Sequence, residues 1–259
     1  MDTNVRINEA DSKRKYGEQY ATGYDQRRFE TTEGRYAQQF ELELFTRLLK
    51  SYGVRTLLDA PVGTGRVALP LAREFDITGA DISPAMLASA KERAAAEGID
   101  NVAWIECSVD RLPFSDGHFD GVVTARLFQH VPKAMANTIV RELARVVRPE
   151  GIVILQFRSG LYGLVLKFIR YYIVRRTGNI RHKCIFPDQM AHYFSGLEIV
   201  GRYGYKFPGA GVAAKFLGFG VVSSVERVLA SIPGVRWLGK YMTFVVRRVP
   251  SGAGARVSA

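Results

Sequence analysis

The sequence predicts an α/β protein built on a doubly wound sheet. The stretch 57–81 (LLDAPVGTGRVALPLAREFDITGAD) supports this prediction most strongly. A short apolar run ends at Asp59, a glycine turn follows, a helix-like segment covers 66–74, and a second apolar run ends at Asp81. A strand, a glycine loop, a helix and a strand tipped by an acid are, in this order, typical of the nucleotide-binding half of such a sheet.

The glycine loop and its two flanking acids indicate the kind of ligand. Gly63 and Gly65 allow a tight turn and a close approach of ligand to backbone, and Asp81 lies where a ribose diol needs a bidentate acceptor. Gly63, Gly65 and Ala68 also satisfy the G-x-G-x-x-G/A pattern of dinucleotide sites, so the glycines alone leave two cofactor classes open. Asp59 favours a cationic ligand, because a carboxylate just before the loop would repel a pyrophosphate.

Two motifs carry a resemblance to a known family. Asp59, followed by three residues and then G-x-G, resembles the first motif of the class I S-adenosylmethionine (SAM)-dependent methyltransferases. SAM carries an ammonium and a sulfonium, which suit that carboxylate. The segment SVDRLPFSDGHFDG resembles the type 11 methyltransferase domain and the ubiquinone/menaquinone C-methyltransferases. The residues that match there are Leu112, Pro113, Phe114, Asp116, Phe119 and Asp120.

The resemblance implies a particular architecture. It is a Rossmann-like sheet of seven strands in the order 3-2-1-4-5-7-6, with the last strand antiparallel and helical insertions after strands 5 and 6. A single domain is expected within 16–248. The expected parts, in chain order, are a disordered N-terminus (1–15), a helical lid (16–50), a SAM-binding core (51–157), substrate-side elaborations (158–240) and a flexible tail (249–259).

The resemblance also implies a set of SAM contacts. Ile82 and Met86 take the places that pack on adenine, although Met86 alone would also suit a plain core. At the adenine amino group, Ser108 replaces the usual acid and is a weaker, neutral acceptor; Asp110 is two residues too late in register unless the loop shifts. The predicted cofactor-binding residues are Arg28, Asp59, Gly63, Thr64, Gly65, Asp81, Ile82, Met86, Ser108, Val109 and Arg126. Arg28 belongs to a segment that resembles the lead-in helix of the family, where it would pair with the methionine carboxylate of SAM; the alternative is an aromatic helix that only packs.

The sequence offers one candidate for a catalytic base, with an alternative role for the same residue. The segment RLFQH follows the predicted fourth strand, whose C-terminal end opens the active cleft, and His130 is the candidate. The alternative is a histidine that caps the next helix or contacts SAM without proton transfer. Methyl transfer from a sulfonium is an in-line displacement in which the protein mainly aligns the acceptor. A base is needed only when an oxygen or carbon acceptor must lose a proton.

Charge is distributed unevenly along the chain. Residues 1–150 are net −2, whereas residues 151–259 hold 16 Lys/Arg against three Asp/Glu. This excess indicates either a solvated basic face or attraction to an anionic membrane or a nucleic acid. The basic segment 158–183 suits an interfacial helix on anionic head groups or, equally, a helix that covers the cleft. The two cysteines have no metal-ligand or redox spacing, so no metal site is expected. No signal peptide and no apolar run of ~18 residues is visible. We therefore expect a cytoplasmic location, peripheral on the membrane at most.

The sequence therefore predicts a SAM-dependent methyltransferase acting on a small-molecule or lipid-like acceptor. Support for an apolar acceptor comes from an apolar insertion before the last strand, with Phe216, Leu217, Phe219, Val221 and Val222. Two alternatives stay open. One is a SAM-binding or membrane-surface module without turnover, suggested by the substituted adenine position. The other is a nucleic-acid methyltransferase, suggested by the basic half but disfavoured by ARLFQ where base-amino methylators carry N/D-P-P-Y/F.

Overall fold

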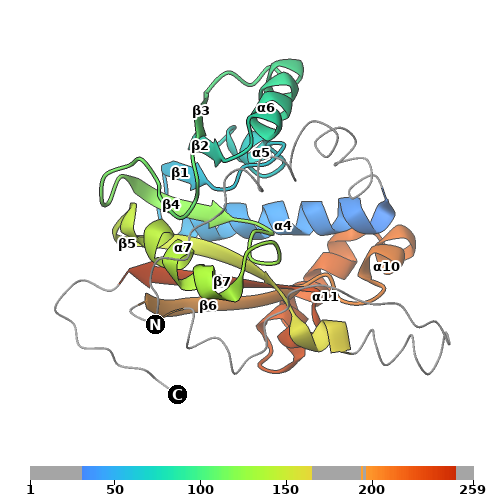
Figure 1. Cartoon of the computed structure of the whole chain (residues 1–259). Helices are drawn as coiled ribbons and strands as arrows, with labels where there is room; N and C mark the ends of the chain where they lie inside the picture. Colours follow the sequence, from blue (N-terminus) through green and yellow to red (C-terminus); the bar gives the residue numbers. More distant parts are fainter. Residues whose placement is uncertain (1–30, 165–193, 195–196, 249–259) are drawn as a thin grey trace.

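The computed structural model of the chain describes residues 31–164, 194 and 197–248. Seven strands form one twisted sheet in the order β3-β2-β1-β4-β5-β7-β6, with β7 antiparallel to both of its neighbours (Figure 1). The predicted fold class and strand order are thereby confirmed. The strands are β1 (Thr56–Asp59), β2 (Asp76–Asp81), β3 (Val102–Glu106), β4 (Phe119–Thr124), β5 (Val147–Arg158), β6 (Leu197–Tyr205) and β7 (Tyr241–Arg248).

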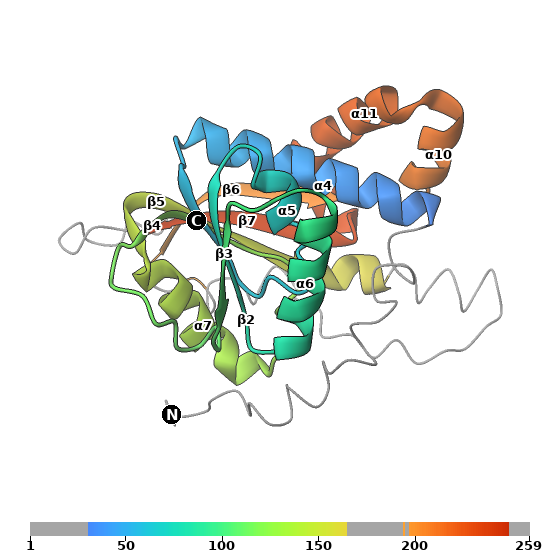
Figure 2. The same cartoon turned by 90° about the horizontal axis from the view of Figure 1, so that it is seen from above.

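Helices cover both faces of this sheet (Figure 2). Adjacent strand residues point to opposite faces, so Leu57 joins a hydrophobic cluster with α4, α5 and α6, while Leu58 joins one with α7. In the described parts of the chain no helix is long and apolar enough to cross a membrane. The helices are α4 (Thr32–Ser51), α5 (Ala68–Leu71), α6 (Pro84–Ala96), α7 (Lys133–Arg145), α10 (Ala210–Leu217), α11 (Phe219–Ser231) and the 3₁₀ helix η2 (Val235–Leu238).

The sheet brings the functional chain segments to one edge. The strands β1, β2, β4 and β5 are parallel, so their C-terminal ends meet there. Because β7 runs in the opposite direction, its first residue, Tyr241, reaches the same edge. Tyr241 pairs in register with Arg158 at the end of β5 and with Tyr205 at the end of β6. The residues around Tyr241 are therefore neighbours of the loops that follow β1, β2 and β4.

The family-like LPF…FD segment supports the fold away from this edge. Asp120 lies at the start of β4 and accepts hydrogen bonds from the backbone N–H groups of Arg55 (2.9 Å) and Thr56 (3.0 Å). It also pairs with Arg148, and although burial opposes ionisation, these contacts lower the pKa of its carboxyl group. Asp116 pairs with Arg145 of α7 at 2.8 Å. These acids hold strands and helices together and lie remote from the C-terminal edge.

One helix is shorter than the pattern suggested. The helix expected over 66–74 is only the four-residue α5, and Pro70, which has no N–H to donate to the Arg66 carbonyl, accounts for its late start. The described part of the predicted lid is α4, which packs against the sheet, and residues 16–30 lie outside the described residues. The expected helical insertion after strand 6 is present as the pair α10 and α11, separated at Gly218 with φ 82°.

Other expectations fall largely outside the described residues. The helical insertion after strand 5 begins at residues 160–164, but 165–193 are not described. Most of the basic segment 158–183 is therefore outside the described part, as are the N-terminal segment 1–15 and the tail 249–259. The predicted disorder at both ends and the interfacial helix stay predictions.

Candidate functional site

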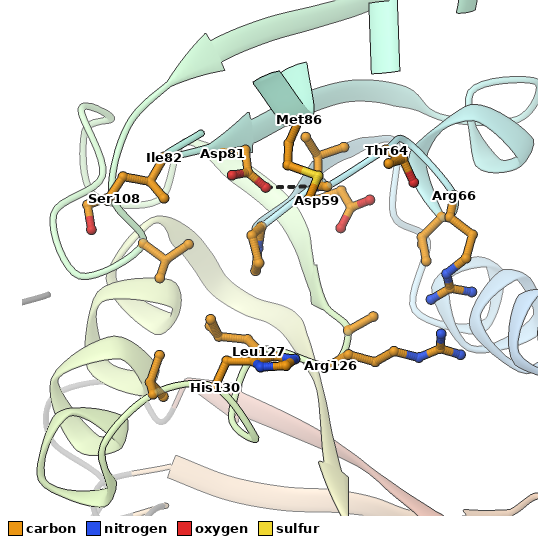
Figure 3. A pocket seen from close by; sticks show the side chains of 17 residues that line it. Asp59, Thr64, Arg66, Asp81, Ile82, Met86, Ser108, Arg126, Leu127 and His130 are labelled. Atoms are coloured by element: carbon orange, nitrogen blue, oxygen red, sulfur yellow. Dashed lines mark hydrogen bonds between the residues drawn. The ribbon is translucent and has the colours of Figure 1, made fainter. Parts of the chain in front are cut away.

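A pocket opens at the C-terminal ends of β1, β2 and β4 (Figure 3). It brings together most of the predicted site residues, which arrive from four separate loops. Gly65 belongs to the same glycine loop without lining the pocket, and Arg28 lies outside the described residues. The predicted residues that line the pocket are Asp59, Gly63, Thr64, Asp81, Ile82, Met86, Ser108, Val109, Arg126 and His130.

The glycine loop has the conformation that its sequence requires. Gly63 and Gly65 have φ of 56° and 75°, values that side-chain-bearing residues rarely adopt. A Cβ on Gly65 would also lie 3.0 Å from Cγ of Leu69 in α5. The loop is tied to β2 because the Gly63 N–H donates to Oδ2 of Asp81 at 2.8 Å. These contacts keep the backbone of the loop at the floor of the pocket.

Asp81 ends β2 with its carboxylate almost fully buried. Its Oδ1 accepts from the Ser83 N–H at 2.9 Å, while Oδ2 accepts from Gly63. Burial raises the pKa of Asp81 to about 6, although these N–H groups oppose the shift. Each carboxylate oxygen can accept a further hydrogen bond, so Asp81 can hold the two hydroxyls of a ribose.

Asp59 ends β1 and is 1% exposed. Its Oδ2 atom is buried and has no hydrogen-bond partner in the described part of the chain. Burial raises the pKa of Asp59 to about 8, and the Arg66 guanidinium and the Ala68 N–H only partly offset this effect. A buried acceptor without a partner is costly, and an ammonium group would supply both the missing hydrogen bond and the missing counter-charge.

The opposite end of the pocket is apolar and ends in a serine. Ile82, Met86 and Val109 line it, and Met86 and Val109 are buried. The Ser108 hydroxyl donates to Oδ1 of Asp110, while Asp110 itself does not line the pocket. Asp110 therefore acts on the pocket through Ser108. With its proton directed to the carboxylate, the Ser108 oxygen presents its lone pairs to a donor such as an amino group.

An ion cluster that the sequence patterns did not indicate lies behind the pocket. Glu41 of α4 is fully buried and pairs with Arg66 and, at 3.4 Å, with Arg126. It also accepts hydrogen bonds from Gln156 of β5 and from the Tyr205 hydroxyl. Burial opposes the charge of Glu41, but the two guanidinium groups outweigh it and lower the pKa to about 2. Glu41 therefore fixes both arginines at the pocket wall.

One signal in the sequence could have revealed Glu41. It lies four residues before Phe45 and seven before Leu48, on the apolar stripe of α4. An acid at a core-facing position is seldom buried without a partner. Gln156 is a similar exception within the apolar run of β5.

His130 lines the pocket from the loop before α7, but one of its ring nitrogens is engaged. Its Nε2 lies 2.9 Å from Nε2 of Gln129. An amide nitrogen only donates, so this contact requires the His130 Nε2 to accept and the ring proton to sit on Nδ1. The geometry supports an oriented imidazole that faces the pocket (Figure 3).

Fold and site together define a class I SAM-dependent methyltransferase. A family profile described as "Methyltransferase domain" matches residues 57–151. Over 192 residues the chain is 30% identical to the ubiquinone/menaquinone biosynthesis C-methyltransferase UbiE of Desulfotalea psychrophila, covering 71% of this chain and 73% of that protein. The chain belongs to the class I SAM-dependent methyltransferase family. SAM is its methyl donor, and the orphaned carboxylate oxygen of Asp59 fits the charge of that cofactor.

One further relative and one solved structure are also similar to the chain. It is 39% identical over 123 residues to the demethylmenaquinone methyltransferase of Thermus thermophilus, covering 44% of this chain and about half (53%) of that protein. The fold resembles magnesium protoporphyrin IX methyltransferase of Synechocystis PCC 6803, solved with bound SAH. The TM-score is 0.63 at 17% identity, over 90% of this chain and 98% of that one. This second likeness concerns the fold alone.

Proposed function

We propose that this methyltransferase transfers the methyl group of SAM to a small-molecule or lipid-like acceptor by in-line displacement. The observation that carries the acceptor class is an exposed apolar face on α10 and α11, close after the end of β6. Exposed apolar surface of this kind commonly marks a binding surface. The large apolar residues exposed there are Val212, Phe216, Leu217, Val221, Val225 and Val228.

The relatives support the same class. One is named a ubiquinone/menaquinone biosynthesis C-methyltransferase and another a demethylmenaquinone methyltransferase. A quinone precursor with an apolar tail would suit an apolar face. The predicted residues Phe216, Leu217 and Val221 lie on this face, whereas Val222 is buried. Phe219 packs on Tyr36 of α4, with ring centroids 5.2 Å apart.

We assign the cofactor contacts as follows. Asp59 binds the ammonium group of SAM, Asp81 binds the ribose hydroxyls, and Ser108, supported by Asp110, accepts from the adenine amino group. Ile82, Met86 and Val109 enclose the adenine ring, while the glycine loop with Thr64 and Gly65 runs along the cofactor. Arg126 closes the pocket on the acceptor side. Arg28 remains the predicted partner of the methionine carboxylate.

His130 is the proposed base for an acceptor that must lose a proton. Its Nε2 would have to exchange the Gln129 contact for the acceptor hydroxyl or carbon acid. The variants His130→Ala and Gln129→Ala separate this role from a purely orienting one. Loss of turnover in the first, with SAM affinity retained, supports the base. Equal turnover in His130→Ala and wild type would assign His130 to cofactor contact alone.

Multiple-turnover release of S-adenosylhomocysteine tests the proposed function. The acceptors are a demethylmenaquinol analogue in detergent micelles, its short-chain water-soluble counterpart, and total RNA. Turnover with either quinol supports a small-molecule acceptor, and a preference for the long tail supports a lipid-like one. Turnover with RNA alone would establish the nucleic-acid alternative, and SAM binding without turnover on any acceptor would favour a binding module.

A membrane surface is the proposed place of such an acceptor. The basic balance of residues 151–259 and the apolar face of α10 and α11 both favour anionic bilayers. Co-sedimentation with vesicles containing phosphatidylglycerol, and with neutral vesicles, tests this. Binding to neither would refute the membrane surface as the place where the acceptor is bound.

A further inference from the structure

A second polar site lies beside the cofactor pocket, around the ring of Tyr241. This residue begins β7 and is 7% exposed. Its register partners are Arg158 and Tyr205, so it sits where the ends of β5 and β6 meet the start of β7. Tyr241 is therefore enclosed by strand ends from the half of the sheet that contributes nothing to the cofactor pocket.

Four basic side chains surround this ring. The Arg126 guanidinium carbon lies 5.2 Å from the centroid of the ring, and the Lys240 Nζ lies 5.5 Å from it. Arg158 stands opposite Tyr241 in the sheet, and the Lys206 carbonyl accepts from the Lys240 N–H at 3.1 Å. We call Arg126, Arg158, Lys206 and Lys240 the basic cluster.

Few acidic side chains balance the positive charge of the basic cluster. Within the described residues, no ion pair involves Arg158, Lys206 or Lys240. The acids that act on the cluster are Glu41, which already pairs with Arg66 and Arg126, and Glu33 at the start of α4. The buried Arg158 Nε has no hydrogen-bond partner there.

The ionisation of these groups reports the same excess of positive charge. Burial lowers the pKa of both lysines, which is the expected effect of removing a cation from water. Burial alone would raise the pKa of Tyr241, yet the four cations lower it to about 8. Partly buried cations that lower the pKa of a neutral neighbour in this way create a positive potential that would attract an anion.

Two backbone features hold the cluster in place. Arg126 and Lys206 both have left-handed backbones, with φ of 62° and 59°, although neither is glycine. Such conformations are costly for a residue with a Cβ and are concentrated at functional sites. Arg126 follows the end of β4 and Lys206 follows the end of β6, so both conformations occur where a strand ends beside the cluster.

We propose that the basic cluster binds an anionic oxygen group, a carboxylate or a phosphate, carried by the methyl acceptor. This inference rests on the proposed function, because it places the acceptor next to the cofactor. Arg126 belongs both to the pocket lining and to the cluster, so an anion held there lies beside the cofactor. Guanidinium groups bind such oxygens through paired hydrogen bonds. Together with the apolar face, the site describes an amphipathic acceptor with an acidic head.

The test uses the full-length protein, saturated with SAH and labelled with ¹³Cζ-tyrosine. The Tyr241 resonance is assigned by its absence in Tyr241→Phe. Inorganic phosphate and acetate are titrated separately, with sodium chloride at matched ionic strength as the reference. We expect saturable shifts of the Tyr241 signal, and a rise of at least half a unit in its pKa, with phosphate or acetate but not with chloride. The stronger of the two probes identifies the oxyanion class.

Variants locate the response. The double variant Lys206→Gln/Lys240→Gln should weaken binding of the probe at least tenfold, whereas Lys215→Gln, which removes an exposed charge from α10, should not.

Calorimetry with SAM on the same samples separates the anion site from the proposed function. Normal SAM binding with no saturable anion response, or a response equal to that of chloride, would overturn the anion site and leave the methyltransferase intact. Tenfold weaker SAM binding in the double variant would instead assign the cluster to the cofactor's own carboxylate. If the double variant fails to fold, the wild-type comparison of phosphate with chloride still decides.

Discussion

The two sides of Arg126 carry ionisable groups of opposite kind, acids on one side and bases on the other. On the β1–β2 side, two buried carboxylates, Asp59 and Asp81, have pKa values raised to about 8 and about 6. On the β5–β7 side, Arg158, Lys206 and Lys240 surround Tyr241 without an ion-pair partner among the described residues. Each side keeps partly desolvated ionisable groups that a ligand of opposite charge would complement. A cationic methyl donor and an anionic acceptor would therefore bind on different sides of Arg126.

Glu41 forms the boundary between these sides, and its loss should have the largest effect. The variant Glu41→Ala leaves Arg66 and Arg126 buried without their counter-charge, and removing one member of such a cluster destabilises by roughly 3–5 kcal/mol. Chemical denaturation measures this change. The exposed Glu43→Ala on the same helix is the control and should be close to neutral. Equal stability of the two variants would show that the cluster does not hold the boundary.

The variant Asp81→Ala should impair cofactor binding and leave the basic cluster unchanged. Hydrogen bonds to charged groups contribute about 1.5–3 kcal/mol each, so losing the ribose contacts should weaken SAM binding on the order of 100-fold. Calorimetric titration with SAM measures the effect. Circular dichroism must show an intact fold, because Asp81 also holds the Gly63 and Ser83 N–H groups. Unchanged affinity in a folded variant would refute the assignment of the ribose site.

The pH dependence of SAM binding sharpens the role of Asp59. Its pKa of about 8 in the free protein means that the carboxyl is largely protonated at pH 7, while a bound ammonium favours the ionised form. SAM affinity should therefore rise a few-fold between pH 7 and pH 8, with proton release on binding, before the ammonium group of SAM itself loses its proton at higher pH. Calorimetry in buffers of different ionisation enthalpy measures both. In Asp59→Asn the rise above pH 7 should vanish; if it persists, another group titrates.

The same pKa has a consequence for stability. The folded-state pKa of Asp59 lies above the unfolded value of about 4, so its favourable contribution is complete below pH 4 and is lost as pH rises through 8. Asp59→Asn removes this loss. The variant should therefore be more stable than wild type at pH 9, as thermal unfolding without cofactor would show. A variant less stable than wild type at that pH would mean that Asp59 is stabilised by partners in the folded protein.

Asp110 should have the smallest effect. Asp110→Asn keeps the size of the side chain but weakens the acceptor for the Ser108 hydroxyl, and the expected loss of SAM affinity is a few-fold. Ser108→Ala should lose somewhat more. The double variant should then match Ser108→Ala, because Asp110 acts through the serine. Additive losses of SAM affinity in the double variant would show that Asp110 does not act through Ser108.

The sequence predicted the residues that gather in the pocket better than those of the basic cluster, for a physical reason. Around Gly63, Asp59 and Asp81, the residues proposed to bind the cofactor also shape the local backbone, so short motifs indicate them. The basic cluster depends on strand order, because Arg126, Arg158, Lys206 and Lys240 are far apart in the chain and meet only at the sheet edge. The LPF…FD segment shows the converse. Its acids are conspicuous in the sequence, yet Asp120 caps the start of β1 away from the pocket.

The most direct measurement is a crystal structure of the protein with S-adenosylhomocysteine and phosphate. The amino and carboxylate groups of this product report which side of Arg126 holds which charge. We predict the amino nitrogen at hydrogen-bond distance from Asp59, the ribose on Asp81, and a phosphate among Arg158, Lys206 and Lys240. A cofactor whose carboxylate occupies the basic cluster, with Asp59 left without a partner, would contradict the division between an acidic side for the cofactor and a basic side for the acceptor.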